Sequence, residues 1–130
     1  MKVLTGKVVT GVGNFAYWIE KLHEHYLRKT GLDLFPGTLN VQLEEEYRIP
    51  SDAARLEGSE YGGTVSVNIV PCRIFDEPAV ILRTDACEFE TGVHPRTLVE
   101  VACAVKLRDK YQLKDGDVVR IEIETSGDNS

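Results

Sequence analysis

The chain has 130 residues, of which 42% are hydrophobic and 28% are charged, as is typical of one compact globular domain. Its formal net charge of −6 at pH 7 argues against broad nucleic-acid binding, because that needs a surplus of lysine and arginine to displace counterions from phosphates. A nucleotide ligand stays open, since backbone N–H groups, one metal ion and a few local cations can hold a triphosphate.

The cysteines and the N-terminal segment indicate a reducing compartment. Cys72, Cys87 and Cys103 are odd in number and form no Cys-x-x-Cys pair, so neither a disulfide framework nor a zinc site is favoured. Cys103 lies in an apolar run, where a buried thiol is expected. The first residues lack the apolar stretch of a secretory signal, and no run approaches the length of a membrane span. We predict a monomeric cytoplasmic protein with one domain over residues 1–125, a disordered tail over 126–130, and no membrane or nucleic-acid partner.

The first part of the chain predicts a strand followed by a helix. Residues 4–10 are rich in β-branched side chains and are bounded by glycines, as strands often are. Over residues 16–29 the apolar side chains recur every fourth position, which is the spacing of one helix face. Asn14 is a candidate N-cap for this helix, and Gly31 follows basic residues in the manner of a helix end.

Three of the remaining apolar runs, residues 38–43, 64–69 and 118–123, alternate with a period of two, which predicts half-buried strands. Residues 70–74 are expected to continue the run at 64–69 past a break at Pro71. Residues 79–82 form another short apolar run. Residues 44–63 predict a loop with a short extended piece at 47–49. Residues 84–96 predict a second long loop, of the kind that often carries function in compact domains.

The segment after the second loop is ambiguous in type. Residues 98–105 are apolar and suit either a strand or a helix, whereas residues 105–113 predict a short helix. Several short strands separated by turn signals, without regular βαβ alternation, favour a sandwich or barrel over a doubly wound sheet. The fold is therefore predicted to be mainly β, with one main helix and one short helix.

The segment from Gly11 to Tyr17 connects the first strand to the first helix. Its two glycines, Gly11 and Gly13, let the backbone approach a phosphate, and the helix that follows presents free N–H groups. No third glycine and no Lys-Ser or Lys-Thr pair follows, so an ordinary tight turn explains this segment better when it is taken alone.

A second candidate site follows the turn at Pro36 and Gly37. Thr38 and Asn40 are two residues apart at the start of a predicted strand, so their side chains lie on one face. A hydroxyl and an amide oxygen are hard neutral ligands that suit Mg²⁺, which takes further ligands from water and substrate phosphates. A turn in which these two side chains satisfy nearby backbone groups is an equally good interpretation.

Further charged residues have less specific interpretations. Glu100 stands in an apolar run and needs a partner or ligand if it is buried, although an outward position on an edge strand fits the pattern better. Lys106 and Arg108 could neutralise phosphate charge, but solvated cations on a short helix are the ordinary explanation. His23 and His25 are two apart on the predicted helix and cannot share a face, so they form no zinc-binding pair.

Taken in this order, these elements resemble the archaeal-type CTP-dependent riboflavin kinase family. The resemblance runs from about residue 4 to residue 124, almost the whole chain. Each matching piece is weak alone, and the ordered set is fairly specific. The pieces are residues 6–13, 36–41, 98–101, 106–108 and 113–119.

The resemblance implies a six-stranded cradle-loop β-barrel and the transfer of a phosphate from CTP to riboflavin, giving FMN and CDP. It also implies an Mg²⁺-binding pair at Thr38 and Asn40. Flavin contacts are implied at Glu100 and at Thr91, with Thr84 as the other candidate threonine. The implied nucleotide contacts are Val12, Gly13, Asn14, Phe15, Ala16, Tyr17, Val105, Lys106, Leu107 and Arg108.

Phe15 stands where the family usually carries a further glycine. A phenyl group there motivates an alternative, a non-catalytic flavin- or nucleotide-binding module on the same barrel. Stabilisation by ligand without turnover would distinguish this alternative from a kinase. A DNA-binding β-barrel is a third hypothesis, and the acidic charge and the lack of a helix-turn-helix segment count against it.

Overall fold

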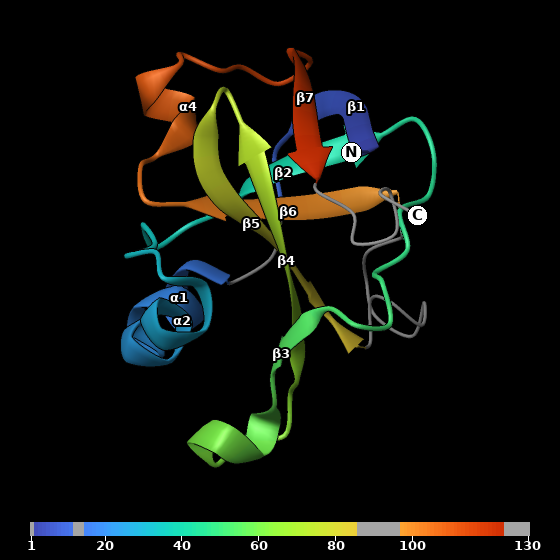
Figure 1. Ribbon diagram of the computed structural model, residues 1–130. Helices are drawn as coiled ribbons and strands as arrows, with labels where there is room; N and C mark the ends of the chain where they lie inside the picture. Colours follow the sequence, from blue (N-terminus) through green and yellow to red (C-terminus); the bar gives the residue numbers. More distant parts are fainter. Residues whose placement is uncertain (1, 12–14, 86–96, 124–130) are drawn as a thin grey trace.

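A computed structural model describes residues 2–11, 15–85 and 97–123 (Figure 1). These residues form seven strands, three α-helices and one 3₁₀-helix. In chain order they are β1 (Lys2–Val9), α1 (Phe15–Lys21), α2 (His23–Thr30), β2 (Leu39–Leu43), β3 (Ala54–Leu56), η1 (Gly58–Tyr61), β4 (Val67–Ile74), β5 (Glu77–Thr84), β6 (Leu98–Cys103), α4 (Leu107–Lys110) and β7 (Val118–Ile123).

Six of the strands close into an antiparallel barrel, as the family resemblance implies. The order around the barrel is β4-β5-β6-β2-β1-β7, and β7 pairs back onto β4 at Arg73↔Glu122 and Ile74↔Ile121. The seventh strand, β3, extends the sheet along the other half of the same β4 edge, with Ala54 opposite Ile69. The ambiguous segment after residue 97 forms a strand, β6, which lies between β2 and β5.

The barrel interior is filled by every second residue of its strands, because successive side chains of a strand point to opposite faces. Val8, Val41, Ile74, Ile81 and Ile121 are completely buried in this cluster. Cys103 is buried in the same cluster, as its apolar run predicts.

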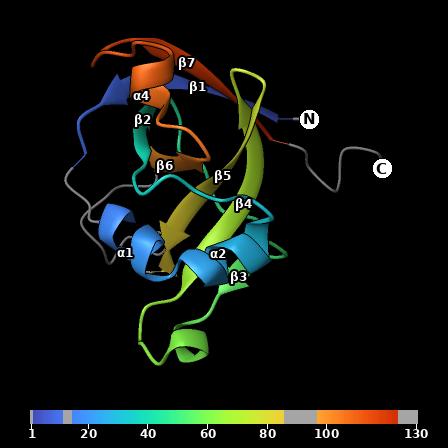
Figure 2. The same ribbon diagram turned by 90° about the vertical axis from the view of Figure 1, so that its left-hand side faces the viewer.

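The outer face of part of the barrel is covered by α1 and α2. Figure 2 shows the two helices running across β4 and β5. Their buried side chains Ile19, Leu22 and Tyr26 pack with Val80 and Leu82 of β5 in a second apolar cluster. The fold therefore has two hydrophobic layers, one inside the barrel and one between the barrel and the helix pair.

The predicted main helix is present, but it is divided into α1 and α2 at Leu22. That residue has φ −105° and ψ 28°, outside ordinary helical geometry. Helix-type backbone hydrogen bonds from Leu22 N to Trp18 O and from Tyr26 N to Leu22 O still connect the two helices across this break. Gly31 ends α2 in the left-handed region at φ 74°, as predicted. Asn14, the expected N-cap, lies outside the described residues.

Two local details differ from the sequence expectation. Residues 47–49 pair with no strand, and the strand in this region is β3. Pro71 does not interrupt β4, which continues through the Pro71↔Val80 pair of the β4–β5 ladder. Proline has no N–H to donate to a neighbouring strand. On the edge of β4 that faces away from β5, β3 pairs with residues 67–69 and β7 pairs with residues 73–74. Pro71 lies between these two pairings, so neither of them needs its missing N–H.

Among the described residues, no helix has both the length and the apolar character that crossing a membrane requires. The tail that the sequence predicts over residues 126–130 lies outside the described part of the chain.

Candidate functional site

Thr38 and Asn40 share a face with Glu100 on the outer side of the barrel. Asn40 of β2 pairs with Glu100 of β6, and paired residues of neighbouring antiparallel strands point to the same side of the sheet. Thr38 comes two residues earlier and donates a hydrogen bond from Oγ1 to Glu100 Oε1 at 2.8 Å. Glu100 faces outward, as the pattern predicts, but it is only 8% exposed and lies on a central strand, so its expected position on an edge strand is wrong.

Asn40 presents an unsatisfied acceptor to this site. Its side chain is 9% exposed, and its Oδ1 accepts no hydrogen bond from any residue that the structure describes. A buried acceptor without a partner costs free energy, so such atoms in native proteins usually meet a ligand, an ion or water. The sequence alternative, in which Asn40 satisfies nearby backbone, leaves this oxygen unexplained.

Gly11 is placed directly against the Asn40 side chain. A Cβ added at Gly11 would lie 2.1 Å from Asn40 Nδ2 and 2.3 Å from both Cγ and Oδ1. These distances are far below van der Waals contact, so only glycine allows the backbone after β1 to approach the carboxamide this closely. The glycine at position 11 is thus required by the site and not only by a turn.

A pocket of about 290 Å³ opens over these residues. It brings together the start of α1, the end of β1, the turn before β2, and α4. The described residues that line it are Val9, Thr10, Gly11, Phe15, Ala16, Gly37, Thr38, Asn40 and Arg108. Five of the residues that the family resemblance singles out, Phe15, Ala16, Thr38, Asn40 and Arg108, therefore meet in one cavity.

Arg108 brings a fixed positive charge to the pocket rim. Its Nη2 donates to Val9 O at 3.2 Å and to Asp115 Oδ1 at 2.6 Å. The other oxygen of Asp115 accepts a hydrogen bond from Thr10 Oγ1 at 2.6 Å. The hydrogen bonds from Thr10 and then from Arg108 hold the pKa of Asp115 below its ordinary value. Asp115 therefore orients the guanidinium without occupying the pocket.

A second pocket of about 210 Å³ adjoins the first and shares Gly37, Thr38 and Arg108 with it. The segment before α4 forms one wall through Val105 and Lys106. The adjacent Leu107 packs into the barrel interior and is 4% exposed, so α4 is anchored on the core. The two predicted nucleotide-contact segments thus face one continuous recess around Thr38.

The remaining predicted residues are placed as follows. Tyr17 is 57% exposed, packs edge-on against Trp18, and is not among the described residues that line either pocket. Thr84 is half-buried at the end of β5, two positions beyond Leu82, which pairs with Glu100. By strand periodicity Thr84 and Glu100 share the outer face. The other predicted residues Val12, Gly13, Asn14 and Thr91 lie outside the described residues.

The described residues contain no group of three or more His, Cys, Asp or Glu side chains that could hold a metal ion. His23 is hydrogen-bonded to Asp33, and His25 lies 3.3 Å from Glu60 O, so both are accounted for away from the pockets. A metal ion in the first pocket would therefore depend on the oxygens of Thr38 and Asn40 together with oxygens from a substrate.

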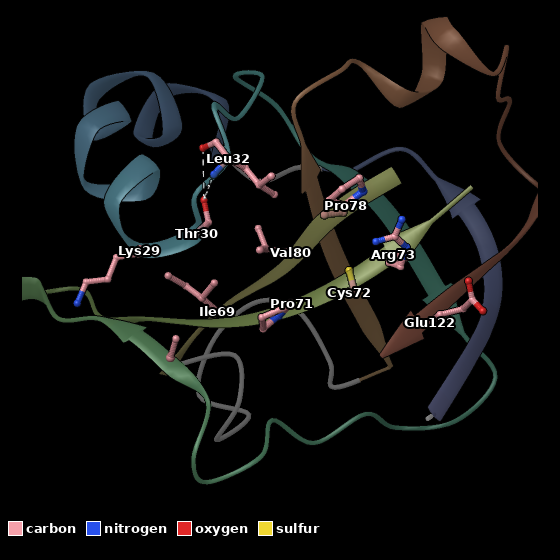
Figure 3. A pocket seen from close by; sticks show the side chains of 12 residues that line it. Lys29, Thr30, Leu32, Ile69, Pro71, Cys72, Arg73, Pro78, Val80 and Glu122 are labelled. Atoms are coloured by element: carbon pink, nitrogen blue, oxygen red, sulfur yellow. Dashed lines mark hydrogen bonds between the residues drawn. The ribbon is translucent and has the colours of Figure 1, made fainter. Parts of the chain in front are cut away.

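A third cavity, larger than these two, lies over the outer side of β4 and β5 near the end of α2 (Figure 3). It measures about 340 Å³, and Ile69, Pro71 and Val80 contribute to its mainly apolar wall. None of the described residues that line it lines either of the other two pockets. None of the described residues that line it is a predicted nucleotide, flavin or metal contact.

Fold and site together define a small closed β-barrel domain with an oxygen-lined, arginine-bordered recess on its outer face. Residues 8–123 match the model of the CTP-dependent riboflavin kinase family, which is described as a domain of unknown function, DUF120. The chain belongs to this family, as the sequence resemblance indicates.

Curated relatives carry the name riboflavin kinase. The protein from Methanocella arvoryzae is 34% identical over 94% of this chain and 57% of its own length. The protein from Pyrobaculum arsenaticum is 34% identical over 92% of this chain and 60% of its own length. The protein from Archaeoglobus fulgidus is 33% identical over 92% of this chain and 54% of its own length. The chain thus spans somewhat more than half the length of these relatives.

Sequence reasoning missed two functional features of the site. The first is the hydrogen bond between Thr38 and Glu100, which lie 62 positions apart. The second is Asp115, which orients Arg108. The only sequence signal for Asp115 was the Asp115-Gly116 turn inside the last matched segment.

Proposed function

We propose that this domain is a riboflavin kinase that transfers a phosphate from CTP to riboflavin, giving FMN and CDP. Membership in the family and the names of its relatives support this proposal. The observation that carries it is Asn40 Oδ1, which has no partner among the described residues and lies beside Thr38 in a pocket bordered by Arg108. CTP as the donor rests on the family's name.

The donor chemistry of the pocket fits Mg²⁺. The Thr38 hydroxyl has one proton, which it donates to Glu100, so its lone pairs are left for a cation. Asn40 Oδ1 offers a second neutral oxygen. Mg²⁺ typically takes one or two protein ligands and keeps water and substrate phosphates for the rest. When bound there, Mg²⁺ would supply neutralisation of the phosphate charge.

The other pocket residues serve to position the phosphates. Arg108 is held by Asp115 at the rim and adds positive charge next to the recess. Gly11 and Gly37 keep the pocket wall free of side chains near Thr38 and Asn40. Phosphoryl transfer requires positioning and charge stabilisation more than covalent participation by the protein, so these elements are the ones the reaction needs.

The reaction itself requires a simple exchange of bonds. The ribityl 5′-hydroxyl oxygen forms a bond to the terminal phosphorus of CTP, the bond from that phosphorus to the bridging oxygen breaks, and CDP leaves with that oxygen. The hydroxyl proton is released. We assign Glu100 the role of orienting the Thr38 hydroxyl. We also propose that Glu100 contacts the flavin, together with Thr91 or Thr84.

The direct test uses the purified domain with riboflavin, Mg²⁺ and either CTP or ATP, with FMN measured by chromatography. We expect FMN with CTP and at least about tenfold less with ATP, a discrimination that contacts to one nucleobase can provide. Equal rates with ATP would remove CTP specificity, and no FMN with either nucleotide would remove the kinase proposal.

Phe15 favours one alternative. Its partly buried side chain lines the first pocket, the one over Thr38 and Asn40, where it takes up space that a glycine would leave free. A binding module without catalysis would show a rise in melting temperature with CTP or riboflavin and no FMN. The variant Phe15→Gly separates the two functions, because gain of turnover in that variant alone would establish the module.

A further inference from the structure

Helix α4 carries two of the predicted nucleotide contacts but is too short to be stable alone. It has four residues, Leu107–Lys110, and its first residues have no side-chain cap. Helices of this length depend on tertiary contacts, since nucleation of a helix is unfavourable. The beginning of α4 is anchored by Leu107 in the core and by the Arg108–Asp115 ion pair. Its end is anchored by a different part of the molecule.

That other part is the tip of the β4–β5 hairpin. The ring of Phe75 stacks on the ring of Tyr111 with centroids 4.2 Å apart and planes 16° from parallel. Tyr111 Oη donates to Glu77 Oε2 at 2.7 Å, and Lys110 Nζ lies 2.6 Å from the same oxygen. We call Phe75, Glu77, Lys110 and Tyr111 the hairpin clamp.

The hairpin turn has a backbone that its residues do not favour. Phe75 and Asp76 form a two-residue turn between the paired residues Ile74 and Glu77, and both have positive φ, 53° and 62°. Hairpins of this kind strongly prefer Asn, Asp or Gly at the first turn position and Gly at the second, because bulkier side chains such as that of Phe75 are strained in the left-handed region. Gln112, next to the clamp, has φ 51°, and these are all the non-glycine residues with positive φ in the described chain.

All of this unfavourable backbone is therefore gathered around one contact between a hairpin and the end of α4. Strained residues persist where the surrounding structure holds them, and they often accompany functional sites. A phenylalanine at the first turn position costs turn stability but provides the ring that stacks on Tyr111. The stack holds the C-terminal end of α4, and the residues just before the N-terminal end of this four-residue helix, Val105 and Lys106, form a wall of the second pocket.

We propose that the hairpin clamp positions α4 for nucleotide binding, with Phe75 as its principal positioning residue. This inference rests on the proposed function, because it assigns the clamp a role in that site. The clamp residues do not line either pocket in the described chain, so they act through Lys106 and Arg108. Loss of the clamp contacts lowers the fraction of molecules in which α4 is ordered and Lys106 forms the wall of the second pocket. The apparent affinity for the nucleotide falls in proportion to that fraction.

The test replaces the strained turn with a relaxed one, Phe75→Asn with Asp76→Gly. The new turn suits the hairpin, so the melting temperature stays level or rises, while the stack on Tyr111 is lost. We expect the KM for CTP to rise about fivefold, in proportion to the lost fraction of ordered α4. The kcat and the KM for riboflavin are expected to stay near the wild-type values.

Two controls isolate the ring. Asp76→Gly alone relaxes the turn but keeps the stack, so its KM for CTP should match the wild type. Phe75→Tyr keeps an aromatic ring on Tyr111 and should also match. A rise in KM with Asp76→Gly equal to that of the double variant, or an unchanged KM in the double variant, overturns the proposal.

Hydrogen exchange tests the clamp independently of catalysis. The amides of Lys110 and Tyr111 donate to Lys106 O and Leu107 O within α4. In the double variant these amides should exchange at least several times faster, while the β1–β2 ladder keeps its protection. Unchanged exchange at α4 overturns the clamp. If the wild-type protein forms no FMN, the kinase proposal fails, and the exchange result still decides whether the clamp orders α4.

Discussion

Neighbouring residues on β2 and β6 meet opposite environments. On the inner face, Val41 is completely buried and Val99 is 1% exposed in the barrel core. On the outer face of the same strands, Asn40 and Glu100 are buried polar groups, and one Asn40 oxygen has no partner among the described residues. The inner residues are satisfied by packing, whereas Asn40 on the outer face keeps an acceptor that no described residue satisfies.

The contrast shows how a small barrel can carry the outer-face site that we propose without weakening its core. Because side chains alternate along a strand, one residue can stabilise the fold while the next serves a ligand. Changes on the inner face should therefore lower stability and leave ligand affinity unchanged. Changes on the outer face should act on the nucleotide binding that we propose for it, whether or not they also alter stability.

The largest effect is expected from Gly11→Ala, which adds a methyl group against the outer face. Its Cβ would lie 2.1 Å from Asn40 Nδ2, so the carboxamide must move. A displacement of this size at a substrate-positioning group lowers kcat/KM about 100-fold. The melting temperature also falls. Adding Asn40→Ala should recover the melting temperature, and failure to recover it would place the strain elsewhere.

Val41→Ala removes two methyl groups from the inner face. We expect a loss of about 2 kcal/mol in the free energy of unfolding, measured with urea, because the change leaves a cavity in a fully packed core. The KM values should remain close to the wild type below the unfolding transition. A large rise in the KM for CTP would contradict the separation of the two faces.

Asp115→Asn gives the smallest effect, through pH. The pKa of Asp115 in the folded protein lies below its ordinary value of 3.8, because of hydrogen bonds from Thr10 and Arg108. Its ionised form therefore contributes stability above about pH 3.8, and that contribution is lost as the pH falls through the lower folded-state value. The variant should show a shallower loss of urea midpoint between pH 5 and pH 2. Identical pH profiles of the urea midpoint in the variant and the wild type would show that ionised Asp115 does not contribute to stability.

Most strands of the barrel could be predicted because alternation along a strand is a local signal, whereas their closure into a six-stranded barrel was implied only by the family resemblance. The runs that became β2 and β7 alternate cleanly, and their positions were predicted within a residue or two. Strand β3 was missed because it has only three residues, Ala54–Leu56, within a polar stretch. Pro71 was expected to break a strand because the sequence does not show which edge of β4 lacks a partner at that point.

The site was less predictable than the fold. Thr38 and Asn40 could be proposed as a pair because they are two residues apart on one strand. The environment of Glu100 could not be predicted, because it depends on β6 lying between β2 and β5. The local sequence pattern does not specify this strand order. The same holds for Thr10, Arg108 and Asp115, which meet across a sequence separation of up to 105 positions.

Calorimetric titration of CTP into the domain, with and without Mg²⁺, tests the central claim most directly. The wild type should bind CTP with Mg²⁺ and at least about tenfold more weakly without it, since metal and phosphate ligands bind together. Thr38→Ala with Asn40→Ala should abolish the Mg²⁺-dependent part while the melting temperature stays near that of the wild type. Gln42→Ala, an exposed change on the same strand, is the matched control and should bind as the wild type does. Undiminished Mg²⁺-dependent binding in the Thr38 and Asn40 double variant would contradict the account.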